Sequence, residues 1–225
     1  IVKGGCAVNC RYCFRRHFPY QDNKGSKSVW QTSLEYVAQH PEINEVLLSG
    51  GDPLMAKDSE LKWLVNAIES IPHVKTVRIH SRLPVVLPQR VTPALVAMLA
   101  DFGRPVSLVI HSNHANELDH SVGRALAQLK DSGVTLLNQA VLLAGINDRA
   151  ISQIDLAEAL FDYGVLPYYL HLLDPVAGGA HFDTTEASAL AIYRDMQRAL
   201  PGYLLPRLVR EIPGQAHKTP LLPPI

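Results

Sequence analysis

The strongest constraint on the fold is a regular alternation of strand-like and helix-like segments along the chain. Short apolar runs rich in Val, Ile, Leu and Thr are separated by stretches whose apolar residues recur at helical spacing. Such alternation is typical of βαβ units, and it predicts an α/β fold: a partial (β/α)6 barrel, counted as about six units. The predicted strands are Ile1–Lys3, Glu45–Ser49, Thr76–His80, Val106–His111, Thr135–Leu143 and Pro167–Leu173, and the predicted helices are Ser33–Gln39, Ser59–Ser70, Pro93–Ala100, Glu117–Asp131, Ile151–Phe161 and Glu186–Ala199.

The composition is that of a single globular domain. Hydrophobic residues make up 47% and charged residues 19% of the chain, and 21 basic residues balance 21 acidic ones. The zero net charge does not favour a nucleic acid or a membrane surface as a partner, and no apolar run approaches a membrane span. We predict a barrel domain over 1–212 and an irregular tail over 213–225. Because the chain starts at Ile1, we expect a missing N-terminal segment.

Polar or glycine residues follow the predicted strands. In a β/α barrel the carboxyl ends of the strands meet on one face and carry the active site. The sequence therefore predicts that these strand ends form the site. They are Gly50-Gly51-Asp52, Ser81-Arg82, Ser112-Asn113 and Asp174.

Three cysteines, Cys6, Cys10 and Cys13, lie within eight residues of one another. A structural zinc site normally has four protein ligands, and a disulfide would use only two of the three thiols. Thiolates are the usual ligands of iron–sulfur cubes, and three of them would leave one iron open to a small molecule. Clustered thiols favour a reducing compartment, so we predict a cytoplasmic protein. The alternatives are a zinc knuckle completed by His17 and unligated core cysteines.

The CxxxCxxC spacing after the first predicted strand resembles that of the radical S-adenosylmethionine (SAM) superfamily. The resemblance implies a barrel of the radical SAM type and a [4Fe-4S] cluster on Cys6, Cys10 and Cys13. It also implies that the open iron binds SAM and that the cluster cleaves it to a 5′-deoxyadenosyl radical. Tyr12 matches the aromatic residue common beside the last cysteine, which packs on the adenine side.

Ser49-Gly50-Gly51-Asp52-Pro53 closes the second predicted strand. Taken alone, this segment is a tight β/α turn, although glycines at a strand end also let a ligand approach the backbone. The superfamily resemblance implies that Gly50, Gly51 and Asp52 form the glycine-rich motif that holds the methionine amino group of SAM.

Lys218 lies in the segment Gly214–Pro220, near the end of the chain. A lone lysine is most often a solvated surface charge, but lysine also forms Schiff bases with pyridoxal 5′-phosphate (PLP). The segment resembles the PLP-lysine loop of the lysine 2,3-aminomutase family, with Gln215, Ala216 and His217 in place of most of its glycines. The resemblance implies that Lys218 binds PLP.

The resemblance to lysine 2,3-aminomutases extends along nearly the whole chain and implies substrate contacts. Arg15 matches an arginine that holds the substrate carboxylate, a task suited to a planar guanidinium, although it could also serve the electrostatics of the cysteine loop. Asp174 and Glu211 match two acids that bind the substrate ε-ammonium. Glu211 stands where free-lysine enzymes carry aspartate, and a simple ion pair with Arg207 or Arg210 is the alternative.

Two further residues match positions around the cofactors. His111 and Gln139 are implied to line the region of SAM and PLP. Without the family match, His111 is equally well explained as a hydrogen-bonded histidine at a strand end, and a buried amide such as that of Gln139 needs partners.

Within the family, the chain looks most similar to a short bacterial aminomutase that makes (R)-β-lysine for elongation factor P. This resemblance implies an isomerase that acts on L-lysine, a flavodoxin or ferredoxin as reductant, and a functional link to a lysyl-ligase. It places the PLP-phosphate ligands before the first strand, outside this chain, and leaves a homo-oligomer open. The alternatives are a radical SAM methylase or maturase without PLP, a free-lysine or glutamate 2,3-aminomutase, and a non-enzymatic metal-binding module.

Overall fold

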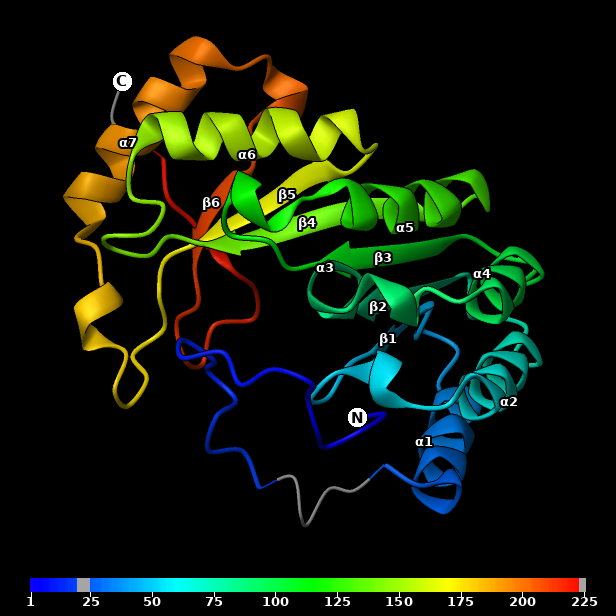
Figure 1. Cartoon of the computed structure of the whole chain (residues 1–225). Coiled ribbons are helices and arrows are strands. Elements are labelled where there is room, and N and C mark those ends of the chain that lie inside the picture. The colour runs from blue at the N-terminus through cyan, green and yellow to red at the C-terminus, as the bar shows by residue number, and fades with distance from the viewer. Residues whose placement is uncertain (20–24, 223–225) are drawn as a thin grey trace. The chain divides into compact units, whose positions relative to one another are not determined.

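Parallel strands alternate with helices along the chain, as the sequence predicted (Figure 1). The computed structural model describes residues 1–19 and 25–222. The chain divides into two units, each with its own contacts. The first comprises Ile1–Val8, Phe18–Ile110 and Arg124–Leu136, and the second comprises Asn9–His17, His111–Gly123 and Leu137–Ile225.

The first unit contains three parallel strands, β1 to β3, with β2 in the middle. Lys3 adds a parallel bridge to Gly50, at the end of β1. Helix α2 contacts both α1 and α4 beside these strands (Figure 1). The strands are β1 (Glu45–Leu48), β2 (Thr76–His80) and β3 (Val106–Ile110); the helices are α1 (Lys27–Gln39), α2 (Asp58–Glu69), α3 (Leu83–Val86) and α4 (Pro93–Ala100), with 3-10 turns η1 (Pro53–Met55) and η2 (Pro88–Arg90).

Helix α2 shows why these segments fold as they do. Four of its apolar side chains recur at helical spacing and are buried, so one face packs into the core. At its start, the Glu60 carboxylate accepts from the Lys57 backbone N–H at 2.9 Å, which satisfies a donor at the helix terminus. The buried residues of α2 are Leu61, Leu64, Val65 and Ile68.

The second unit contains β4, β5 and β6 in parallel and β7 antiparallel to β6. Helix α6 packs on β5 and α7 (Figure 1), and helix α5 is divided between the two units. The strands are β4 (Thr135–Val141), β5 (Leu166–His171), β6 (Arg207–Arg210) and β7 (Thr219–Pro220); the helices are α5 (His120–Asp131), α6 (Ala150–Asp162) and α7 (Glu186–Ala199), with 3-10 turns η3 (Ala115–Glu117), η4 (Ala180–Phe182) and η5 (Gly202–Leu204).

The two faces of β5 differ. Leu170 is 1% exposed, whereas Tyr169 and His171 on either side of it are half-buried. Alternate residues of a strand point to opposite faces, so Tyr169 and His171 share a face opposite Leu170. In register with them lie Gln139 on β4, opposite Tyr169, and Val209 on β6, opposite His171. The polar or aromatic side chains of Gln139, Tyr169 and His171 therefore lie on the same face of the strands of the second unit.

The structure confirms five of the six predicted strands to within two residues at each end and adds elements that were not predicted. The prediction of a strand over Ile1–Lys3 was wrong, because this segment pairs through the isolated bridge of Lys3 to Gly50. Strand β6 was missed because its four residues carry two arginines. Within the tail predicted as irregular, Thr219–Pro220 pairs with β6. The division of the chain at 212 stays a prediction, and residues 223–225 of the tail lie outside the described part of the chain.

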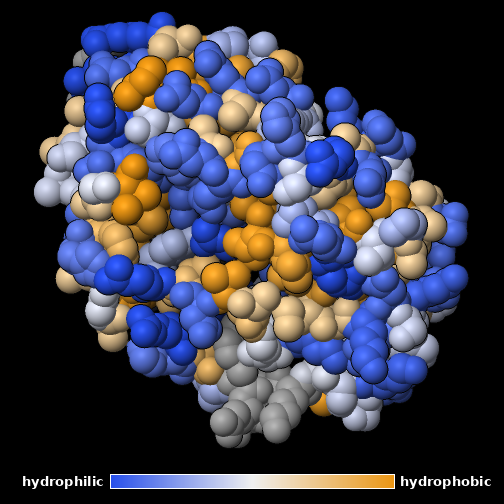
Figure 2. All heavy atoms as spheres, viewed as in Figure 1, coloured by the Kyte–Doolittle hydropathy of each residue, from blue (hydrophilic) through white to orange (hydrophobic). Residues whose placement is uncertain are grey.

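Hydrophilic residues cover much of the surface seen in Figure 2, with apolar side chains between them. Within residues 1–19 and 25–222, no helix combines the length and apolar character that crossing a membrane requires.

Candidate active site

The cysteine loop, residues 6–17, carries three thiols and no disulfide. Cys6 is exposed, and Cys10 and Cys13 are partly buried. A turn joins the last two, with the Cys13 backbone N–H donating to the Cys10 carbonyl at 3.2 Å. Among residues 1–19 and 25–222, no three His, Cys, Asp or Glu side chains are grouped closely enough to hold a metal ion. The fit to an iron–sulfur cube therefore rests on the chemistry of the donors, since one loop carries three thiols.

Two side chains on the cysteine loop contact residues of the second unit that are far away in the sequence. The Tyr12 hydroxyl accepts from Asn113 Nδ2 at 2.7 Å. Arg11 lies 3.1 Å from His181 Nε2, and its guanidinium stacks over the Phe182 ring at 5.1 Å. These contacts hold the segment between Cys10 and Cys13 at two consecutive residues.

Two other loop residues differ in exposure. Arg15, the predicted carboxylate ligand, is half-buried, and its guanidinium lies 5.1 Å from the centre of the Phe14 ring. His17, the alternative fourth metal ligand, is exposed. The role of Arg15 toward a substrate stays a prediction.

The glycine motif after β1 packs against the chain that leads into Cys6. Gly50 has φ +146°, and a Cβ there would lie 2.3 Å from the Lys3 carbonyl oxygen. The Gly51 N–H donates to that oxygen at 2.7 Å, and a Cβ on Gly51 would lie 2.3 Å from the Gly5 carbonyl oxygen. Close backbone approach therefore requires glycine at both positions.

Asp52 has a buried side chain that joins the ends of β1 and β2. One carboxylate oxygen accepts from the Ser81 hydroxyl at 2.8 Å and the Leu54 N–H at 2.9 Å, and the other accepts from the Arg82 N–H at 2.8 Å. Burial raises the pKa of this carboxyl, and the hydrogen bonds from Ser81, Arg82 and Leu54 oppose that rise. The geometry assigns the Asp52 side chain to the turn; the predicted SAM contacts of Gly50, Gly51 and Asp52 stay predictions.

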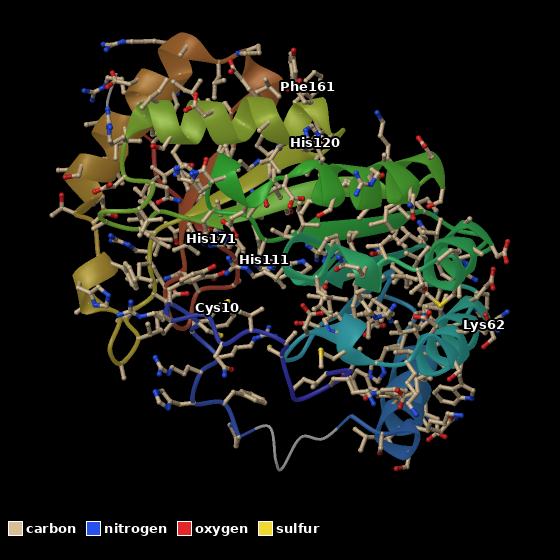
Figure 3. All side chains as sticks on the ribbon, in the orientation of Figure 1. Cys10, Lys62, His111, His120, Phe161 and His171 are labelled. Carbon is tan, nitrogen blue, oxygen red and sulfur yellow. The ribbon has the colours of Figure 1, made fainter. Side chains whose placement is uncertain are left out.

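The side chains of His111 and Gln139 are neighbours, and their role beside the cofactors stays a prediction. Gln139 Nε2 is 3.0 Å from His111 Nε2. An amide nitrogen only donates, so this contact needs an unprotonated Nε2 on His111. His111 directly follows β3 (Figure 3). Gln139 lies on the half-buried face of β4.

Lys218 and the two predicted ammonium ligands form one cluster in the second unit. The Lys218 ammonium forms a salt bridge with the Glu211 carboxylate. Burial raises the pKa of Asp174, the Glu211 charge raises it further, and the Lys218 charge lowers it, so the three groups lie within electrostatic reach. Glu211 therefore pairs with Lys218, while Arg210 pairs with Glu186 at 2.8 Å.

His171 belongs to the same cluster, although the sequence assigned it no role. Burial, followed by the Lys218 charge, lowers the pKa of His171 to about 4, and the Glu211 charge opposes this shift. Its Nε2 is buried with no hydrogen-bond partner among the described residues. The Tyr169 ring lies 5.5 Å from the His171 ring and 5.6 Å from the Lys218 ammonium. His171 lies at the end of β5 (Figure 3). The alternation of side chains along a strand could have indicated that His171 and Tyr169 share a face.

Comparison with known proteins places these residues in a family. The model of the Radical SAM superfamily matches residues 1–157. An L-lysine 2,3-aminomutase of Escherichia coli K12 is 58% identical over 221 residues, 98% of this chain and 65% of that protein. An L-lysine 2,3-aminomutase of Haemophilus influenzae is 53% identical over 97% of this chain and 65% of its own length. The chain thus spans slightly under two thirds of each of these curated relatives.

Solved structures agree on the fold. The crystal structure of a radical SAM methyltransferase from Sphaerobacter thermophilus superposes with a TM-score of 0.59 at 14% identity, covering 93% of this chain and 64% of that one. This likeness and the strand–helix order confirm the predicted fold class, a partial barrel of the radical SAM type. The predicted resemblance to lysine 2,3-aminomutases is also confirmed. Because the superfamily model covers more than half of its residues, the chain belongs to the radical SAM superfamily.

Proposed function

We propose that this chain is the core of a lysine 2,3-aminomutase, an isomerase that converts L-lysine to (R)-β-lysine. The high identity to two proteins of that name supports the proposal. Because the chain spans 65% of each relative, the complete protein is expected to contribute further groups, among them the ligands of the PLP phosphate.

One observation carries the proposal: Lys218, Glu211 and Asp174 lie in one cluster after β5 and β6. The two carboxylates give the cluster more negative than positive charge, since His171 is held neutral. A site of this kind attracts a second ammonium group, such as the one at the end of a lysine side chain. Glutamate has a carboxylate at that end, and the same charges would repel it.

The cofactors follow from the superfamily and from the donor groups. A [4Fe-4S] cluster and SAM are implied for radical SAM proteins, and we propose Cys6, Cys10 and Cys13 as the cluster ligands. Together they would supply the radical. We propose that Lys218 binds PLP, which would supply electron delocalisation. The Lys218 side chain is half-buried and directly precedes β7. Gly50, Gly51, His111 and Gln139 are proposed to line the cofactor region.

The chain's own residues orient the substrate in this proposal. Arg15 would bind the α-carboxylate through a planar guanidinium, and Asp174 and Glu211 would bind the ε-ammonium. Holding both ends of the substrate selects its length as well as its charge. The Glu211 side chain, one methylene longer than aspartate, sets the depth at which the ammonium is held.

We also propose a cellular role: the product would modify elongation factor P through a lysyl-ligase. A cytoplasmic flavodoxin or ferredoxin would supply the electron to the cluster. The similarity of this chain to the short bacterial aminomutases supports this assignment, which is separate from the chemistry of the site.

The test is anaerobic turnover by the full-length protein with reductant, SAM and PLP. L-lysine is expected to give β-lysine, and L-glutamate is expected to give no product. Asp174→Asn and Glu211→Gln should lower kcat/KM for lysine by about 10-fold or more, because each removes a charge from the ammonium site. Glu186→Gln is the matched control, since Glu186 pairs with Arg210 outside the cluster.

Two results would contradict the proposal. Turnover of glutamate in preference to lysine would refute the assignment of Asp174 and Glu211. A protein that cleaves SAM but shows no PLP absorbance sensitive to borohydride and to Lys218→Ala would instead be a radical SAM enzyme without PLP.

A further inference from the structure

We propose that Asn113 is a positioning residue for the cysteine loop, holding the phenol of Tyr12 between Cys10 and Cys13. Asn113 Nδ2 donates to the Tyr12 hydroxyl oxygen at 2.7 Å across a separation of 101 residues. Both residues belong to the second unit. The inference rests on the proposed role of the cysteines as cluster ligands and is independent of the substrate and of PLP.

The orientation of the Asn113 amide follows from its other contact. The Val141 backbone N–H donates to Asn113 Oδ1 at 2.9 Å. Only the oxygen of an amide side chain can accept a hydrogen bond, so the nitrogen must face Tyr12. The hydrogen bond to Tyr12 thus has a defined direction, with the phenol oxygen as acceptor.

Asn113 itself is placed by the fold. Its side chain is buried, with 5% of the residue exposed. Its backbone N–H donates to Glu117 Oε1 at 2.6 Å, and its carbonyl accepts from Asn147 Nδ2 at 2.8 Å. Asn147 is fully buried and accepts from the Leu143 N–H at 2.7 Å. A satisfied buried network of this kind is rigid, so it can serve as a fixed support for Tyr12.

The position of Tyr12 determines that of the two thiols beside it. Tyr12 lies inside the turn closed by the Cys13 N–H and the Cys10 carbonyl. Its neighbour Arg11 is held separately through His181, 170 residues away. Without the Asn113 contact, one of these two supports is lost, and the loop gains freedom at the residues that would ligate iron. Hydrogen bonds around a cluster and its ligands also influence its electronic properties.

The test uses the full-length protein with its cluster reconstituted anaerobically. Tyr12→Phe removes only the hydroxyl, and Tyr203→Phe is the matched control because Tyr203 is 60% exposed. We expect Tyr12→Phe to release iron from the reduced cluster to a ferrous chelator about five- to tenfold faster than wild type, the effect of losing one hydrogen bond. The EPR spectrum of the reduced cluster in the presence of SAM should also change. Tyr203→Phe should match wild type in both measurements.

A second variant tests whether the hydrogen bond to Tyr12, rather than the amide group itself, supports the loop. Asn113→Asp retains the acceptor for Val141 and offers Tyr12 a carboxylate to which its hydroxyl can donate. Iron release from this variant is therefore expected to stay within about threefold of wild type, because residue 113 and Tyr12 remain joined by a hydrogen bond. Release as fast as in Tyr12→Phe would count against the inference.

Other outcomes are equally decisive. Equal iron release and equal EPR spectra in wild type and Tyr12→Phe would overturn the inference, even if Tyr12→Phe lowered the urea midpoint of the apoprotein. A wild-type protein that assembled no iron–sulfur cluster would refute the cysteine assignment and the inference with it. The absence of a cluster in wild type is thus distinguishable from equal iron-release rates in wild type and Tyr12→Phe.

Discussion

The neutral state of His171 predicts a specific dependence of stability on pH. Burial and the Lys218 charge lower the pKa of His171 from 6.5 to about 4 in the folded protein. On acidification the unfolded chain therefore binds a proton before the folded protein does. The contribution of His171 to stability is fully present above pH 6.5 and is lost as the pH falls from about 6.5 to about 4.

The size of this effect follows from the two pKa values. A tenfold difference in proton affinity between the folded and unfolded states corresponds to about 1.4 kcal/mol, so the full contribution is about 3 kcal/mol. Between pH 7 and pH 5, where unfolding can be measured without strong acid, linkage predicts that wild type loses about 2 kcal/mol through this residue. His171→Gln carries a neutral side chain throughout that range and should lack this loss.

Urea unfolding of the reduced apoprotein, followed by circular dichroism at several pH values, measures the effect. The free energy of unfolding of wild type minus that of His171→Gln should fall by about 2 kcal/mol between pH 7 and pH 5. His120→Gln is the control, because His120 is exposed at the start of α5 (Figure 3). Parallel pH profiles for wild type and His171→Gln, or an NMR titration of His171 with a midpoint near 6.5, would refute the reasoning.

Three further predictions concern residues of the candidate site. Lys218→Met should raise the pKa of His171, because the Lys218 charge helps to lower it; an NMR titration showing no rise would contradict the cluster. Gly51→Ala should lower the free energy of unfolding by about 1–3 kcal/mol, because its Cβ would lie 2.3 Å from a carbonyl oxygen. The control Gly202→Ala should leave the free energy of unfolding unchanged, because a Cβ at Gly202 would have no atom within 4 Å. Asp52→Asn should lower the free energy of unfolding, measured by urea titration at pH 7, by about 1–3 kcal/mol, because one of the groups that donate to the carboxylate loses its acceptor. An unchanged midpoint would show that the turn does not need the carboxylate.

Much of the fold could be predicted because strands and helices leave local patterns. The strand Thr76–His80 and the helices Pro93–Ala100 and Glu186–Ala199 were predicted with the bounds that the structure has. The arginines in β6 obscure its pattern, so that strand becomes evident only from its pairing with β5. Helix α1 begins at Lys27, earlier than predicted, where Ser26 accepts from the Val29 N–H as an N-cap.

The candidate site could be predicted where a residue type limits the chemistry. Three closely spaced thiols and a lysine in a family-like loop are visible in the sequence whatever surrounds them. The reason for glycine at Gly50 and Gly51 was not visible, because it lies in the approach of a segment more than 40 residues earlier in the chain. The pairing of Glu211 with Lys218, rather than with either nearby arginine, likewise depended on the geometry.

By itself, the sequence determined the order of strands and helices, the spacing of the cysteines and the family to which they belong, since each is written in neighbouring residues. Only the tertiary structure decided that His171 stays neutral beside Lys218 and Glu211, that the Asp52 carboxylate closes a turn, and that Asn113 reaches Tyr12. These properties depend on burial and on distances between atoms far apart in the chain, and local patterns of residues encode neither.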